Sequence, residues 1–154
     1  MRKIIWFSLI GVVIAVDQLS KWAITKSFHF GETRNIFPSF DLTLRYNTGA
    51  AFNFLAEADG WQRWFFIGLA LTVFVIVSVW LIKLPLNEKL EGFALSLIAG
   101  GAVGNLIDRL VHGHVIDFIL VYYKAWEWPA FNIADSAICV GVALLLIKII
   151  KKPS

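Results

Sequence analysis

Charged residues are scarce in this sequence, and cysteine is nearly absent. Only 16% of the 154 residues are charged, whereas 58% are hydrophobic and the mean hydropathy is +0.72. This composition is far more apolar than that of a water-soluble domain. The single cysteine, Cys139, excludes an intramolecular disulfide and a CxxC metal or redox motif. The sequence therefore predicts a membrane protein in which Cys139 faces lipid or packs in the interior.

The basic residues do not form the continuous basic face of a nucleic-acid-binding protein. The net charge is +3, but seven of the fourteen lysines and arginines lie in short segments beside apolar runs. We interpret them as residues that orient membrane spans. The sequence also has no internal repeat and no low-complexity tract, so we expect one membrane-embedded domain over residues 1–154.

Four apolar segments are long enough to cross the roughly 30 Å hydrocarbon core of a bilayer as helices. They cover residues 4–24, 64–82, 93–111 and 133–150. The first follows Arg2 and Lys3 and so resembles a secretory signal peptide, but no A-x-A cleavage motif follows it and three more spans do. We therefore expect a retained first helix in an all-α integral membrane protein with four spans.

Positive charges predict how these spans are oriented. With four spans both termini lie on one side, and the short segments of that side carry Arg2, Lys3, Lys83, Lys89, Lys148, Lys151 and Lys152. The basic residues of the other side are spread over two longer loops, residues 25–63 and 112–132. The positive-inside rule then puts both termini in the cytoplasm. Tryptophans near the span ends are typical of membrane interfaces: Trp61, Trp64, Trp80, Trp126 and Trp128.

The first long loop contains two patterned segments. Residues 41–47, DLTLRYN, alternate between apolar and polar side chains, which predicts a strand with Leu42, Leu44 and Tyr46 on one face. Residues 49–61 then form an amphipathic segment that is able to lie on the bilayer surface. We expect a small extracytoplasmic β-sheet and an interfacial helix, and we expect the apolar side chains of that helix, Phe52 and Phe54, to contact bilayer or substrate as part of a lid.

Carboxylates inside the spans are the main functional signal, because a charge in a membrane costs a few kcal/mol and usually serves a function. A rise of about 1.5 Å per residue places Asp17 roughly 20 Å from the cytoplasmic end of its helix, and Asp108 and Asp135 roughly 22 Å from theirs. Three carboxylates therefore reach one level in the outer third of the bilayer. Asp117 follows just past the outer end of the third span.

The third span carries the densest polar pattern. In GGAVGNLIDRL, Asn105, Asp108 and Arg109 share one side of the helix, and we interpret Asp108 with Arg109 as a structural ion pair. Three glycines in the same stretch allow close helix approach, although such spacing is common in apolar spans: Gly100, Gly101 and Gly104.

Two further polar pairs lie on the first and fourth spans. Asp17 and Lys21 are spaced i, i+4, which fits a structural ion pair and a substrate contact equally well. Asn132 and Asp135 are spaced i, i+3 at a helix start, where the helix dipole favours an anion and a carboxylate also caps the helix. Capping does not explain Asp117, which is surrounded by apolar residues without a basic partner nearby in sequence.

Two carboxylates held close together in a site of low dielectric share one proton, because both cannot ionise easily. One then acts as a base on water while the other polarises a scissile carbonyl, which is the chemistry of peptide hydrolysis. No Ser/His/Asp or Cys/His arrangement competes, and the two histidines of residues 112–114, HGH, lack a third metal ligand. A transporter or proton pathway and a non-enzymatic scaffold are the alternatives, but a pathway requires polar residues through the full membrane thickness.

Five motifs in order along the chain resemble those of the lipoprotein signal peptidase family, signal peptidase II. They are VDQLSKW (16–22), RYNTGAAF (45–52), GGAVGNLIDRL (100–110), GHVIDF (113–118) and FNIADSAI (131–138). Their spacing and the four-span layout agree over nearly the whole chain, and five ordered motifs are far more specific than any one of them.

The resemblance implies an aspartic endopeptidase of the bacterial inner membrane. Such an enzyme removes the signal peptide from prolipoproteins by cutting before a diacylglyceryl-modified cysteine, it uses no metal or organic cofactor, and the cyclic lipopeptide globomycin inhibits it. Asp117 and Asp135 match the family's catalytic dyad. The other matching polar positions, which line or support the substrate site, are Asp17, Lys21, Asn47, Asn105, Asp108, Arg109 and Asn132.

Overall fold

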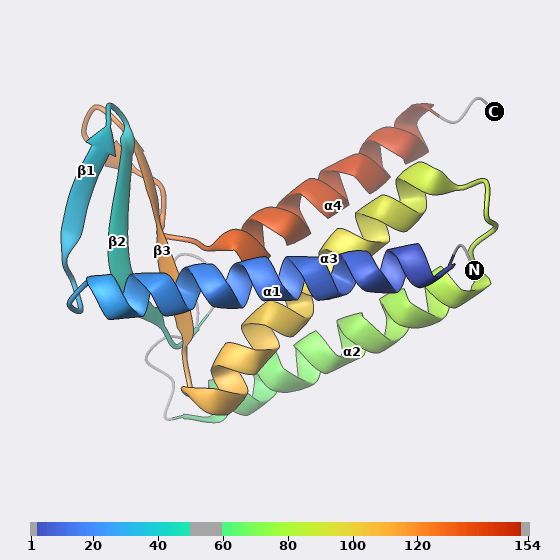
Figure 1. Cartoon of the computed structure of the whole chain (residues 1–154), viewed down its shortest axis with the longest axis horizontal. Coiled ribbons are helices and arrows are strands. Elements are labelled where there is room, and N and C mark those ends of the chain that lie inside the picture. The colour runs from blue at the N-terminus through green and yellow to red at the C-terminus, as the bar shows by residue number, and fades with distance from the viewer. Residues whose placement is uncertain (1–2, 50–59, 152–154) are drawn as a thin grey trace.

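A computed structural model describes residues 3–49 and 60–151 and confirms the four spans. The spanning helices are α1 (Lys3–Ser27), α2 (Trp61–Lys83), α3 (Lys89–Val111) and α4 (Ile133–Lys151). Figure 1 shows a β-sheet at one end of the helices, while the start of α1 and the end of α4 both lie at the opposite end. The predicted interfacial helix and its residues Phe52 and Phe54 lie outside the described residues, so the lid remains a prediction.

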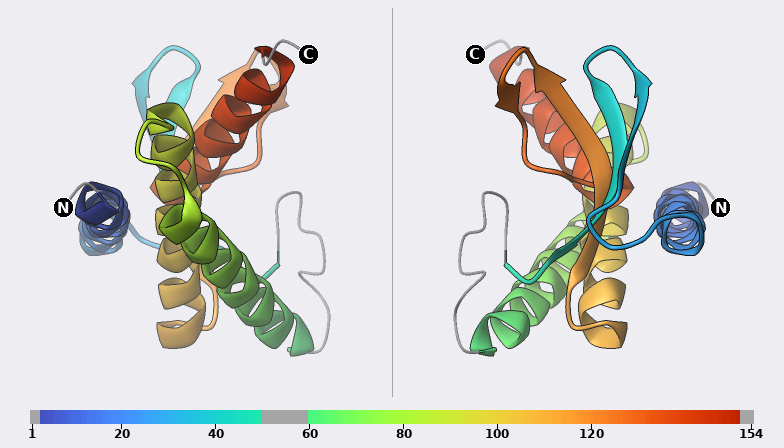
Figure 2. Two further views of the ribbon diagram at one scale, coloured as in Figure 1. Left: turned by 90° about the vertical axis from the view of Figure 1, so that its right-hand side faces the viewer. Right: turned by 90° about the vertical axis from the view of Figure 1, so that its left-hand side faces the viewer.

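Helix α3 occupies the centre of the bundle. In its most apolar stretch 67% of the residues are buried, against 11% to 22% for the other three helices. Figure 2 shows α1 on one side of α3, while α2 and α4 diverge from each other on the other side. Lipid tails are as apolar as a leucine side chain, so moving helix surface from lipid to protein gives no hydrophobic gain. Helices in a membrane therefore associate through close packing. A Cβ added at Gly100 would lie 2.7 Å from Cβ of Val13 in α1, and one at Gly101 would lie 2.4 Å from the carbonyl oxygen of Ala134 in α4.

We expect Gly101→Ala to destabilise the bundle by about 1–3 kcal/mol, because the added methyl group meets backbone that cannot rotate away. Gly68→Ala on α2 is the matched control, since a Cβ there meets nothing within 4 Å. Thermal unfolding of both variants in one detergent measures the difference. Equal melting temperatures would show that the close approach of α3 to α4 is not needed for stability.

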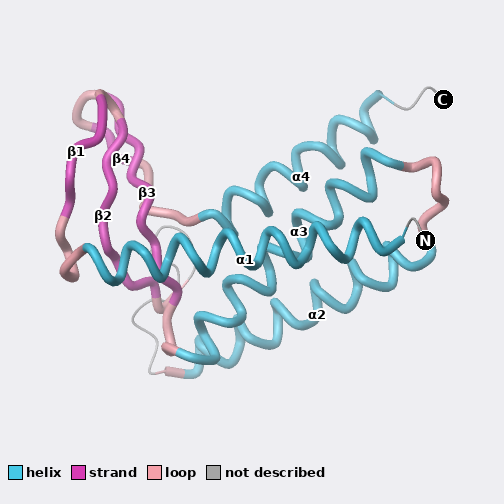
Figure 3. Tube along the Cα trace, in the orientation of Figure 1, coloured by secondary structure: helices cyan, strands magenta, loops and turns pink. Residues whose placement is uncertain are grey.

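The sheet has four antiparallel strands in the order β1-β2-β3-β4. They are β1 (Thr33–Phe37), β2 (Phe40–Asn47), β3 (Val115–Tyr123) and β4 (Trp126–Glu127), and Figure 3 shows the strands running across the axis of α1. The cluster of Ile24, Leu44, Ile116 and Phe118 packs the sheet onto the end of α1.

Strand β2 confirms the strand predicted over residues 41–47, but the predicted alternation of faces is wrong at its centre. Thr43 and Leu44 are both buried, whereas Tyr46 is 43% exposed. The pairing register of β2 with β3 shifts between Leu42 and Arg45, and such a bulge reverses the side to which later residues point. Tyr46 therefore leaves the apolar face to which the sequence assigned it.

The second long loop was not predicted to contain regular structure, yet it supplies β3 and β4. Its run of β-branched and aromatic residues, VIDFILVYY, is typical of a buried strand and is the signal that would have indicated β3. This strand fixes the position of Asp117, which pairs in register with Arg45 of β2.

Candidate active site at the sheet end of the helices

A buried ion-pair cluster joins α1 to α3. Nζ of Lys21 lies 2.8 Å from Oδ2 of Asp17 and 2.8 Å from Oδ2 of Asp108. All three side chains are at most 2% exposed, so the interactions are shielded from water. The predicted pair of Asp17 and Lys21 is present, and the lysine also serves Asp108.

The predicted ion pair between Asp108 and Arg109 is wrong. Successive residues of a helix point about 100° apart, so Asp108 faces Lys21 of α1 while Arg109 points towards Phe66 of α2. The guanidinium of Arg109 donates a hydrogen bond to the carbonyl of Gly49 at 3.0 Å and lies 4.9 Å from the ring of Phe66. Its Nε is buried and has no hydrogen-bond partner among residues 3–49 and 60–151.

Two asparagines connect the ion-pair cluster with Asp117 and Asp135. Oδ1 of Asn105 accepts hydrogen bonds from Nζ of Lys21 and Nδ2 of Asn132, both at 3.2 Å. Because that oxygen faces the two donors, Nδ2 of Asn105 faces Asp135 and donates to its Oδ1 at 2.7 Å. Nδ2 of Asn132 donates to Oδ1 of Asp117 at 2.8 Å. Both carboxylates are thus held by amides that contact each other.

Asp117 is 3% exposed and receives a second hydrogen bond from Nδ2 of Asn47 at 3.1 Å. Burial, followed by the negative charge of Asp135, raises the pKa of Asp117 from 3.8 to about 7. The hydrogen bonds from Asn47 and Asn132 and the charge of Lys21 act in the opposite direction. A carboxyl group in this environment holds its proton up to about neutral pH.

Asp135 caps its helix, as the structural interpretation of this residue predicted. Oδ1 of Asn132 accepts from the backbone N–H of Asp135 at 2.9 Å, and Oδ2 of Asp135 accepts from the backbone N–H of Asn132 at 3.3 Å. This reciprocal arrangement is a capping box. Oδ1 of Asp17 accepts a further N–H of this first turn, from Ala134 at 2.9 Å, so the first turn of α4 is fixed against α1.

Gln18 belongs to the same network, although the sequence analysis did not select it. Its Nε2 donates to Oδ1 of Asp108 at 2.9 Å and to Oδ2 of Asp17 at 3.2 Å. An uncharged residue next to Asp17 gave no functional signal by itself. The sequence feature that could have pointed to it is its place inside the motif VDQLSKW, directly after Asp17.

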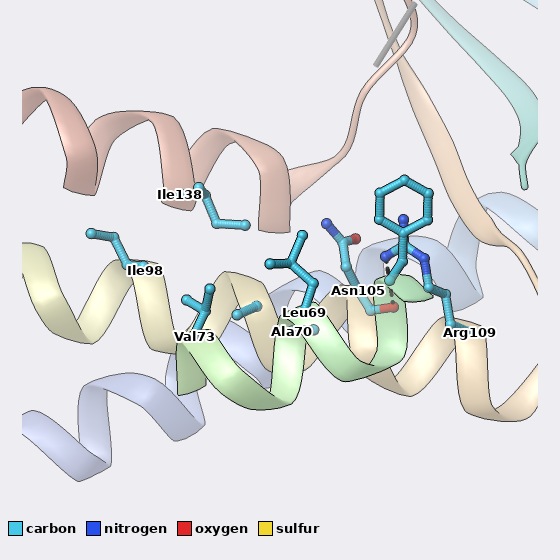
Figure 4. A pocket seen from close by; sticks show the side chains of 9 residues that line it. Leu69, Ala70, Val73, Ile98, Asn105, Arg109 and Ile138 are labelled. Carbon is cyan, nitrogen blue, oxygen red and sulfur yellow. Dashed lines mark hydrogen bonds between the residues drawn. The ribbon is translucent and has the colours of Figure 1, made fainter. Parts of the chain in front are cut away.

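A groove of about 180 Å³ leads to the site between α2, α3 and α4. Figure 4 shows Asn105 and Arg109 at the end nearer the sheet, while Leu69, Val73 and Ile98 line the apolar remainder. Asn105 is the residue that donates to Asp135, so the polar end of the groove adjoins that carboxylate. This arrangement suits an extended or helical peptide with an apolar body and a polar group at one end.

The part of the chain that the structure describes holds no group of three or more histidine, cysteine or acidic side chains arranged to bind a metal. His112 and His114 lie with their ring centroids 6.0 Å apart. Cys139 lies on α4 and is exposed. The five tryptophans predicted at span ends, which lie elsewhere in the chain, are exposed too.

The four spans and the polar site at their sheet end define a multi-pass membrane protein with paired carboxylates next to an apolar groove. The family model of signal peptidase (SPase) II matches residues 9–151. The chain belongs to the signal peptidase II family, which makes it a peptidase.

Relatives and solved structures agree with this membership. The lipoprotein signal peptidase of Ralstonia nicotianae is 54% identical over 142 residues, covering 92% of this chain and 82% of the relative. That of Cellvibrio japonicus is 49% identical, covering 96% and 87%. A solved structure described as a bacterial membrane enzyme, determined in meso at 2.3 Å, superposes with a TM-score of 0.85 at 29% identity, covering 97% of this chain and 92% of that one.

Proposed function

We propose that this protein is an intramembrane aspartic endopeptidase that removes the signal peptide from diacylglyceryl-modified prolipoproteins, cutting before the modified cysteine. The observation that carries the proposal is the pair Asp117 and Asp135, held by the contacting amides of Asn132 and Asn105. The family and the names of the relatives support the substrate class.

The proposed reaction uses the two carboxyl groups in complementary states. The ionised member takes a proton from a water molecule, which attacks the scissile carbonyl carbon, while the protonated member donates a hydrogen bond to the carbonyl oxygen. The tetrahedral intermediate then collapses as the amine leaving group is protonated. The pKa of about 7 for Asp117 supports a shared proton at neutral pH, because it keeps one carboxyl group protonated while the pair carries a single charge.

The groove between α2, α3 and α4 is the proposed path of the signal peptide. Its apolar part accommodates the membrane-embedded segment of the precursor. Nε of Arg109, which has no hydrogen-bond partner among the described residues, supplies a donor for a peptide carbonyl near the scissile bond. In this proposal both termini lie in the cytoplasm and the site lies near the outer leaflet. The acyl chains of the substrate anchor the substrate in that leaflet. A cyclic lipopeptide such as globomycin, which like the substrate joins an apolar chain to a polar peptide, would occupy the same groove.

A cleavage assay with purified protein tests the proposal. We expect a diacylglyceryl-modified prolipoprotein to be cut once, immediately before the modified cysteine, and the unmodified precursor to remain intact. A metal chelator should leave the rate unchanged, because neither carboxylate depends on a metal ion in this mechanism. Folded protein that shows no turnover, or that cuts both precursors equally, would contradict the proposed function.

A further inference from the structure

Two supporting carboxylates each hold the backbone next to one member of the proposed dyad. Oδ1 of Asp17 accepts a hydrogen bond at 2.9 Å from the N–H of Ala134, the residue directly before one dyad member. Oδ2 of Asp108 accepts at 3.0 Å from the N–H of Ile116, the residue directly before the other. The spacing of the two supporting carboxylates therefore influences the spacing of the two dyad residues.

The supporting carboxylates lie close together although they carry like charges. Both contact the single ammonium of Lys21 through Oδ2 at 2.8 Å, so this cluster keeps one uncompensated negative charge. A Cβ added at Gly104 would lie 2.6 Å from Oδ2 of Asp17, which shows how closely α1 approaches α3 here. Like charges repel strongly away from water, so holding Asp17 near Asp108 requires donors in addition to the lysine.

Gln18 supplies such a donor without adding charge. Its Nε2 lies 2.9 Å from Oδ1 of Asp108, 3.2 Å from Oδ2 of Asp17 and 3.2 Å from the carbonyl oxygen of Gly104. The side chain also lines a cavity of about 400 Å³ on the α1 side of α3, together with Lys21. One amide group thus bridges the two carboxylates and the backbone of α3.

We propose that Gln18 is a positioning residue for the dyad. By bridging Asp17 and Asp108, it sets how close the dyad carboxyl groups lie and how strongly they share one proton. This inference rests on the proposed aspartic mechanism. Spacing matters there, because the negative charge of Asp135 is one of the causes that raise the pKa of Asp117. As two coupled carboxyl groups move apart, the two apparent pKa values of the pair approach each other.

Gln18→Met tests this role, because methionine keeps the length of the side chain but donates no hydrogen bond. We expect kcat for prolipoprotein cleavage to fall about 10–100-fold, as small displacements of reacting groups do. KM should change little, since the proposed substrate groove lies between α2, α3 and α4.

The dependence of kcat/KM on pH separates positioning from stability. The bell-shaped profile of a dyad reports the two apparent pKa values of the free enzyme, so a wider dyad should narrow the profile by about half a pH unit or more on each limb. The variant leaves in place the charged residues on the elements packed around the dyad, which are Asp17 and Lys21 of α1, Arg45 of β2, and Asp108 and Arg109 of α3.

Thr25→Val is the matched control. Thr25 lines the same cavity, but its hydroxyl donates to the carbonyl of Trp22 in its own helix at 2.9 Å. Its rate and profile should equal those of the wild type. Gln18→Asn keeps an amide on a shorter side chain, so it should fall between wild type and Gln18→Met in both rate and profile width, and it provides the test if the methionine variant does not fold.

Three outcomes would overturn the inference. A wild-type rate and profile width in Gln18→Met would show that the bridge does not position the dyad. A rate lowered equally at every pH, with a lower melting temperature and an unchanged profile width, would show that Gln18 only stabilises the fold. Wild-type protein that does not cleave would overturn the proposed function as well, whereas the first two outcomes leave that function intact.

Discussion

Replacing Asp117 with asparagine is expected to abolish prolipoprotein cleavage while leaving the protein folded, and Asp135→Asn is expected to do the same. An amide fills the space of the carboxyl group but cannot take up and release a proton. Loss of general acid or base catalysis typically lowers a rate by about 10²–10⁴-fold. In a shared-proton pair each single replacement should therefore remove nearly all measurable turnover.

The same change should leave stability equal or higher at pH 7. Burial keeps Asp117 protonated up to about pH 7, whereas in the unfolded chain an aspartate ionises near pH 4. Between these values the unfolded state releases a proton that the folded state keeps, so the wild-type protein loses unfolding free energy as the pH rises through this window. Asparagine does not titrate. Asp117→Asn should melt at or above the wild-type temperature at pH 7, and its advantage should shrink towards pH 4.

Cleavage and thermal unfolding of the variants are measured side by side in one detergent. Asp41→Asn is the matched control, because Asp41 lies on β2 away from the buried network and bonds to Asn35 instead. It should keep both activity and stability. Turnover comparable to the wild type in Asp117→Asn or Asp135→Asn would remove that residue from the dyad.

The second large effect is expected from Lys21→Ala. This change leaves Asp17 and Asp108 buried without their shared cation, and it removes the donor that orients the amide of Asn105 towards Asp135. Breaking a buried ion pair by removing one partner costs about 3–5 kcal/mol. We expect the variant to lose thermal stability and activity together, in contrast to the dyad variants, which should lose activity alone.

Lys26→Ala provides the control for Lys21→Ala, because Lys26 lies one turn further along α1 and is exposed. It should melt like the wild type. Asp108→Ala tests the same cluster from α3 and should also lose stability and activity. If Asp108→Ala kept both while Asp117→Asn were the least stable variant, the division between supporting residues and dyad would be reversed.

The sequence by itself determined the spans, because burial of backbone polar groups in lipid forces any long apolar segment into a helix. It also determined the pairing of Asp17 with Lys21, since an i, i+4 spacing places both side chains on one face of the same helix. Carboxylates at similar heights on three helices were found from helix rise alone, because rise per residue depends little on context.

Only the tertiary structure decided which partners those carboxylates take. Asp108 bonds to Lys21 of α1 rather than to its neighbour Arg109, because the direction in which α3 packs selects the partner and sequence proximity does not. The bulge that exposes Tyr46 depends on pairing between β2 and β3, which are separated by two helices in the chain. The position of Asp117 beside Asn47 and Asn132 likewise requires β3, the end of β2 and the start of α4 to meet. Such long-range contacts leave no periodic pattern in the sequence.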